Sequence, residues 1–141
     1  MNPFIQQFHS GLAYLVLLLL VVAILNSLRG MSSKKEFTSS DRKIALFALI
    51  VSHIQLVIGL ILYFVSPVGK AALGMMSDSN LRLTALEHPL INIIAIVLIT
   101  IGWSKHKKAI LSTAKFKAIA VFFGLGFVLI LSRIPWSLWF N

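Results

Sequence analysis

The sequence contains no cysteine. This absence excludes disulfide bonds, thiolate metal sites, iron–sulfur clusters and the covalent attachment of c-type haem. Any haem in this protein would be held non-covalently, by side chains such as histidine. Acidic residues are also scarce, with four Asp and Glu against 13 Lys and Arg. Because the four acids lie in three separate segments, we expect no catalytic pair of carboxylates.

Charged residues make up 12% of the chain, about half the fraction of a typical soluble domain, and 58% of the residues are hydrophobic. The hydrophobic residues form four runs, each near the length of about 20 residues that crosses a bilayer. We therefore predict an all-α integral membrane protein with the lipid bilayer as its main partner. Short links favour a four-helix bundle of up-down-up-down topology. The single transmembrane domain, 1–141, is expected to contain helices over about 4–28, 42–65, 81–105 and 112–133, and an interfacial aromatic tail, 134–141.

Local residues predict where two of these helices begin and end. Arg29-Gly30 is expected to end the first helix. The stretch Ser39-Ser40-Asp41 offers an N-cap for the second helix, because these side chains accept hydrogen bonds from free backbone N–H groups.

The net charge of +9 raises the question of nucleic-acid binding. Ten of the 13 basic residues, however, lie in the two links that follow the first and third helices. That distribution is typical of membrane orientation and argues against nucleic acid as a partner. It predicts a multi-pass protein of the bacterial inner membrane with both termini on the periplasmic side. His106, among the lysines of the second link, is expected to be a solvated member of a basic face.

Three other histidines lie in or beside the apolar runs, where ionisable groups are costly and suggest a functional site. A rise of 1.5 Å per residue places His9 and His88 roughly 10–12 Å inside the outer boundary, on helices that are diagonal in the predicted bundle. His53 lies about 20 Å inward by the same count. Two imidazoles at one depth on diagonal helices can bind a flat macrocycle from both faces, as a six-coordinate b-type haem requires.

Each histidine also has a structural interpretation. His9 is close enough to the interface to be a solvated or capping residue. His88 follows Glu87, whose carboxylate can orient the ring or pair with Arg82. His53 can be a ligand, a proton-relay or quinone-contact group, or a hydrogen-bond partner between helices. The three histidines also suggest a metal site, although their spacing over three helices is no known zinc signature.

Other residues near the histidines are weaker candidates. Arg82 and Arg133, at the outer ends of their helices, are candidates to bind haem propionates, and snorkelling to the interface explains them equally well. Two stripes of mostly small residues follow the histidines at helical spacing: Ala13, Val16, Leu20 and Ala23 after His9, and Asn92, Ala95, Ile99 and Gly102 after His88. Small residues leave room for a porphyrin beside Asn92, and they also mark close helix packing.

Four short motifs, in order, resemble those of a family of small four-helix bacterial membrane proteins labelled cytochrome b-like. The motifs are Phe8-His9-Ser10-Gly11-Leu12, Ser52-His53-Ile54-Gln55-Leu56 with Gly59, Glu87-His88-Pro89, and Ser132-Arg133-Ile134-Pro135-Trp136. This resemblance covers nearly the whole chain and implies b-type haem and membrane electron transfer. The architecture is more distantly similar to half of haem A synthase and to other four-helix b-type cytochromes. The chain lacks a histidine in its fourth helix, which puts a second bis-histidine haem in doubt.

The sequence therefore favours a membrane cytochrome with one haem b, serving electron transfer as a subunit of or partner to a respiratory or quinol-linked complex. His88, His9 and His53 are the candidate iron ligands, Asn92, Arg82 and Arg133 are candidate cofactor-binding residues, and quinone is a second candidate ligand. A non-catalytic accessory or assembly subunit with structural histidines is one alternative, and a small metal-handling transporter is another. The sequence has no P-loop, G-x-G-x-x-G, nucleophile-elbow or H-E-x-x-H motif. It thus leaves enzymatic activity open and favours a subunit over a stand-alone enzyme.

Overall fold

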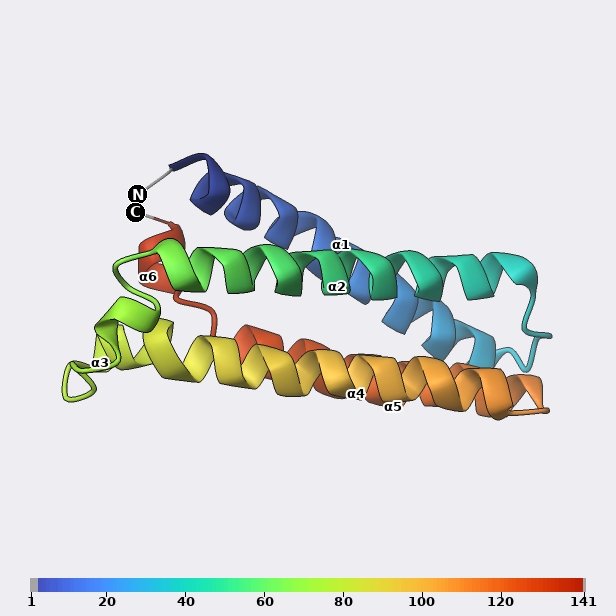
Figure 1. Ribbon diagram of the computed structural model, residues 1–141. Coiled ribbons are helices and arrows are strands. Elements are labelled where there is room, and N and C mark those ends of the chain that lie inside the picture. Colours follow the sequence, from blue (N-terminus) through green and yellow to red (C-terminus); the bar gives the residue numbers. More distant parts are fainter. Residues whose placement is uncertain (1–2, 141) are drawn as a thin grey trace.

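A computed structural model describes residues 3–140 of the chain (Figure 1). Its long helices are α1 (Pro3–Ser32), α2 (Ser39–Val65), α4 (His88–Lys108) and α5 (Ser112–Ser132). The shorter elements are a 3-10 turn η1 (Lys70–Ala72), helix α3 (Ser79–Arg82), a π-helical turn η2 (Leu83–Glu87) and helix α6 (Trp136–Trp139). α3, η2 and α4 follow one another without a break and form one span, Ser79–Lys108. The predicted all-α class is confirmed, since residues 3–140 contain no strand.

The four long helices form a closed bundle in which consecutive helices run in opposite directions (Figure 1). α1 packs against α2 and α5, and α4 packs against the same two helices. α1 and α4 are therefore diagonal across the bundle, as the up-down-up-down topology predicts. The beginning of α1, the end of α2, the beginning of α4 and the end of α5 consequently meet at one end of the bundle.

All four spans are long enough and apolar enough to cross a membrane. Their outward faces carry large apolar side chains along the whole length. Leu18, Val57, Val97 and Val128, one from each long helix, are each more than half exposed. A continuous apolar surface of this kind is stable only in contact with lipid. The protein is thus a multi-pass membrane bundle.

Small residues allow the helices to approach closely in the middle of the bundle. A Cβ atom added to Gly126 would lie 2.7 Å from Ile99 Cγ1 and 3.0 Å from the Ala95 carbonyl oxygen. Leu20, at the same core, is fully buried. The inner parts of the two predicted stripes of small residues therefore mark close helix packing.

Two expected helix boundaries are wrong. α1 continues past Gly30 to Ser32, because Gly30 is buried and packs directly against the ring of Phe116. The N-cap of α2 is Thr38, and Asp41 lies at the third helical position, where it accepts hydrogen bonds from the Thr38 backbone N–H and hydroxyl. This is a capping box, with Asp in place of the usual Glu.

The prediction that His106 is a solvated member of a basic face is also wrong. Its side chain is buried, and its Nδ1 atom lies 2.8 Å from the Trp103 carbonyl oxygen. The ring lies 4.5 Å from that of Trp103 and 5.2 Å from that of Phe37, measured between centroids. Phe37 comes from the link between α1 and α2 and covers the histidine.

Candidate functional site

A cavity of about 290 Å³ lies at the end of the bundle where the helices carrying His9 and His88 meet. α1, α2 and α4 supply most of its lining, and residues after the end of α5 cover it, among them Ile134, Leu138 and Trp139. The Trp139 ring contacts Tyr14 of α1, with centroids 4.7 Å apart. The tail that was expected at the membrane interface therefore closes one side of this cavity.

His9 from α1 and His88 from α4 both line the cavity. Their ring centroids are 6.2 Å apart, and the ring planes are nearly perpendicular, at 86°. The structure thus brings together the two histidines that the sequence places at one depth on diagonal helices. Two metal–nitrogen bonds of about 2 Å, plus the distance from each nitrogen to its ring centre, would separate two axial imidazoles by roughly 6 Å.

The ring of His88 is held by the backbone at the end of α5. Its Nδ1 atom lies 2.8 Å from the carbonyl oxygen of Arg133. A carbonyl oxygen only accepts hydrogen bonds, so Nδ1 carries the proton and Nε2 keeps its lone pair. Asn92, one turn further along α4, donates to the His88 carbonyl oxygen at 2.6 Å and lies 3.2 Å from Nδ1. Asn92 also lines the cavity.

The ring of His9 lies against α2 at a position without a side chain. A Cβ atom added to Gly59 would be 3.0 Å from His9 Cε1, so the glycine makes room for the ring. Gln55, one turn before Gly59, donates through Nε2 to the His9 carbonyl oxygen at 2.8 Å. Among residues 3–140, the buried side-chain atoms without a hydrogen-bond partner are His9 Nδ1 and Gln55 Oε1. Both belong to this site, and the two side chains interact with each other without forming a regular hydrogen bond.

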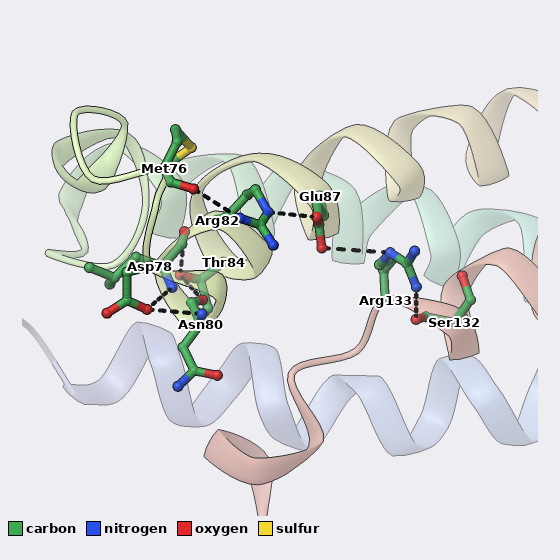
Figure 2. Close-up of polar contacts among 9 residues, drawn as sticks. Met76, Asp78, Asn80, Arg82, Thr84, Glu87, Ser132 and Arg133 are labelled. Atoms are coloured by element: carbon green, nitrogen blue, oxygen red, sulfur yellow. Dashed lines mark hydrogen bonds and ion pairs between the residues drawn. The ribbon is translucent and has the colours of Figure 1, made fainter.

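An ion-pair cluster links α3 and η2 to the end of α5 (Figure 2). Glu87 Oε2 lies 3.2 Å from Arg82 Nε, and Glu87 Oε1 lies 3.7 Å from Arg133 Nε. Arg82 also donates to the Met76 carbonyl oxygen at 3.0 Å. Both arginines, the candidate partners of haem propionates, are therefore engaged by Glu87. Of the two roles that the sequence left open for Glu87, the structure shows the pair with Arg82.

His53 lies outside this cavity. Its Nδ1 atom is 2.7 Å from the Leu49 carbonyl oxygen, and its Nε2 atom is 3.1 Å from Thr100 Oγ1 on α4. This is the hydrogen-bonded contact between helices that the sequence left open for His53. Within the described part of the chain, no group of three or more His, Cys, Asp or Glu side chains is placed to hold a metal ion. The structure thus pairs two histidines and leaves the third elsewhere.

One face of α2 contributes residues that were not predicted as part of the site. Ser52, Gln55, Gly59 and Tyr63 line the cavity, together with Ser66, which caps the end of α2. They recur every three or four positions and so occupy one helical face. A polar stripe of this kind in an apolar span is the signal that would have identified them.

Comparison of the chain with models of known families, with curated proteins and with solved structures finds no match.

Proposed function

We propose that this protein is a membrane b-type cytochrome in which His9 and His88 bind the iron of one non-covalent haem between α1 and α4. The observation that carries the proposal is the separation of the two rings, 6.2 Å between centroids, in the lining of a cavity of about 290 Å³. Two axial imidazoles on an iron keep about this distance. Haem, when bound, would supply one-electron redox chemistry, and the chain would supply the ligands and the apolar surroundings.

The residues around each histidine fit this role. The Arg133 carbonyl oxygen fixes the His88 tautomer that leaves Nε2 free for a metal. His9 Nδ1 is buried and forms no regular hydrogen bond within residues 3–140, so iron ligation would replace only its contact with the Gln55 side chain. Arg82 and Arg133 would meet the propionates by sharing or exchanging their contacts with Glu87.

The distribution of charge supports an orientation for the site. Ten of the 13 basic residues lie at the end of the bundle opposite to the cavity. By the positive-inside rule that end faces the cytoplasm, and the cavity faces the periplasm of a bacterial inner membrane. A small redox bundle without catalytic groups of its own would transfer electrons within or beside a larger respiratory or quinol-linked complex.

The test is a reduced-minus-oxidised spectrum with a pyridine haemochrome assay, on detergent-purified protein expressed with ample haem. The wild type should contain one haem b per chain. His9→Ala and His88→Ala should each lose most of it, whereas the matched control His53→Ala should retain it, because His53 is outside the cavity. A colourless wild type, or equal haem content in all three variants, would refute the proposal.

A second candidate is an accessory or assembly subunit whose histidines serve packing. The observation that favours it is the pairing of His53 with Leu49 and Thr100, which needs no cofactor. It leaves His9 Nδ1 without a regular hydrogen bond in the described part of the chain. A colourless protein whose stability falls with His53→Ala would support this candidate.

A further inference from the structure

A second pocket, of about 370 Å³, lies at the opposite, basic end of the bundle. It is formed where the link before α2, the end of α4 and the beginning of α5 meet. Three cationic side chains line it, Arg42, Lys107 and Lys115, beside Phe37 and His106. No acidic residue belongs to its lining. The pocket is separate from the histidine cavity, and its inferred role does not depend on haem binding.

The charges around this pocket are poorly balanced. The basic end of the bundle carries ten Lys and Arg and two acids, Glu36 and Asp41. Asp41 is already used, because it accepts hydrogen bonds from Lys35, Asn26 and Thr38. In the described part of the chain, the three cations of the pocket form no ion pair with a carboxylate.

Aromatic rings and a carbonyl oxygen position two of these cations. The Arg42 guanidinium lies 5.2 Å from the centroid of the Trp103 ring. Lys115 Nζ donates to the His106 carbonyl oxygen at 3.0 Å and lies 5.9 Å from the centroid of Phe37. An ammonium group has three donors and a guanidinium has five, so most donors remain available to an anion. Such fixed cations are suited to the oxygens of a phosphate group.

The depth of the pocket in the membrane favours a lipid as the source of the phosphate. α5 has 21 residues, which span about 31 Å and match the hydrocarbon core of a bilayer. Its first residue, Ser112, therefore lies near the hydrocarbon boundary. Ile110 and Leu111, just before it, are 93% and 71% exposed, and apolar side chains at this level insert among lipid chains. Lys107 precedes them on the headgroup side, and the side chain of Lys115, from the first turn of α5, reaches back to the His106 carbonyl oxygen.

We propose that this pocket binds the phosphate of an anionic phospholipid headgroup, held by Arg42, Lys107 and Lys115. Basic pockets between membrane helices on the cytoplasmic side are suited to such headgroups. The lipid would fill the space between the link before α2 and the beginning of α5. The bound lipid would thereby bridge the beginning of α2, the end of α4 and the beginning of α5, and its negative charge would offset their positive charges.

Native mass spectrometry of the delipidated full chain tests this, by titration with phosphatidylglycerol and with phosphatidylcholine of the same acyl chains. We expect phosphatidylglycerol to bind at least about tenfold more tightly. The triple variant Arg42→Gln/Lys107→Gln/Lys115→Gln should lose this preference. The matched control Lys43→Gln/Lys108→Gln/Lys117→Gln removes the same charge from exposed positions outside the pocket and should keep it.

Three outcomes would overturn the proposal: equal affinity for the two lipids, an equal loss in the two triple variants, or displacement of the lipid by millimolar inorganic phosphate. The last outcome would assign the pocket to a soluble phosphate. A second measurement needs no charge variant. With Trp136 and Trp139 replaced by Phe, Trp103 is the remaining tryptophan. Its fluorescence should be quenched more by brominated phosphatidylglycerol than by brominated phosphatidylcholine, and equal quenching would contradict the proposal.

Discussion

The Nδ1 atom of His88 lies 2.8 Å from the carbonyl oxygen of Arg133, although the two residues are 45 positions apart in the chain. The contact joins the first residue of α4 to the residue that follows α5. Because it uses the backbone of Arg133, replacement of that side chain leaves the acceptor in place. What holds the Arg133 side chain is Glu87, the residue before His88. Glu87 thus binds the side chain of Arg133, and the next residue, His88, binds its backbone.

Glu87→Gln should lower the free energy of unfolding by about 1 kcal/mol, because it removes two ion pairs that are partly exposed and therefore weak. The loss should shrink at high salt, which screens exposed charges. Thermal unfolding in detergent at low and high salt measures both effects. Asp78→Asn is the matched control: it removes one negative charge at the same end, but asparagine can still cap α3. A loss that is independent of salt would show that packing, and not charge, stabilises this cluster.

The contact between Gly59 and His9 gives a prediction about haem content. Gly59→Val places branched carbon atoms where a single Cβ would already be 3.0 Å from His9 Cε1. The ring must then move, and the proposed ligation by His9 predicts a severalfold lower haem content and a shifted absorbance spectrum. Gly11→Val is the control, because a Cβ atom at Gly11 would meet nothing within 4 Å. Haem content that is equal in the two variants would argue against His9 as a ligand.

The sequence predicts much of this arrangement for simple physical reasons. A bilayer fixes the length of each helix, and short links fix the order of neighbours, so the four spans and their diagonal pairs follow from counting. The same count sets His9 and His88 at one depth and His53 nearly two turns deeper. That difference in depth agrees with the structure, in which His53 pairs with Thr100 and lies outside the cavity.

The features that sequence reasoning missed depend on partners that are distant in the chain. His106 is surrounded by lysines in sequence, and its burial comes from Phe37 on another link. Gly30 looks like a helix end, and it stays helical because Phe116 packs on it. The π-helical turn η2 shifts the helical register by one residue, so the side chains after it point in other directions than a regular α-helix would give them. The spacing of hydrophobic residues does not reveal such a turn.

Asp41 should be among the residues whose loss destabilises the protein most. It is buried and accepts hydrogen bonds from Asn26 at 3.0 Å, from Lys35 at 2.8 Å and from the Thr38 backbone N–H at 2.8 Å. Asp41→Ala removes the acceptor for all three and should cost about 2–4 kcal/mol in thermal or denaturant unfolding. Glu36→Ala removes the same charge from an exposed position of the same link and should cost no more than about 0.5 kcal/mol. Comparable losses in the two variants would show that net charge, and not the hydrogen bonds, sets the stability here.

The surroundings of Gly30 and Gly124 predict opposite effects on stability when each glycine is replaced by alanine. In Gly30→Ala the new Cβ atom would lie 2.5 Å from Phe116 Cζ and 2.6 Å from its Cε atoms. The Phe116 ring has no exposed surface, and it packs edge-on against Phe37 at 4.9 Å, so it cannot move away without displacing its neighbour. We expect a loss of about 1–3 kcal/mol, the usual cost of overpacking. In Gly124→Ala nothing lies within 4 Å, and the higher helix propensity of alanine should leave stability unchanged or raise it by up to about 1 kcal/mol. Thermal unfolding of the two variants in detergent measures the difference, and equal melting temperatures would mean that α1 and α5 do not approach as closely as this packing requires.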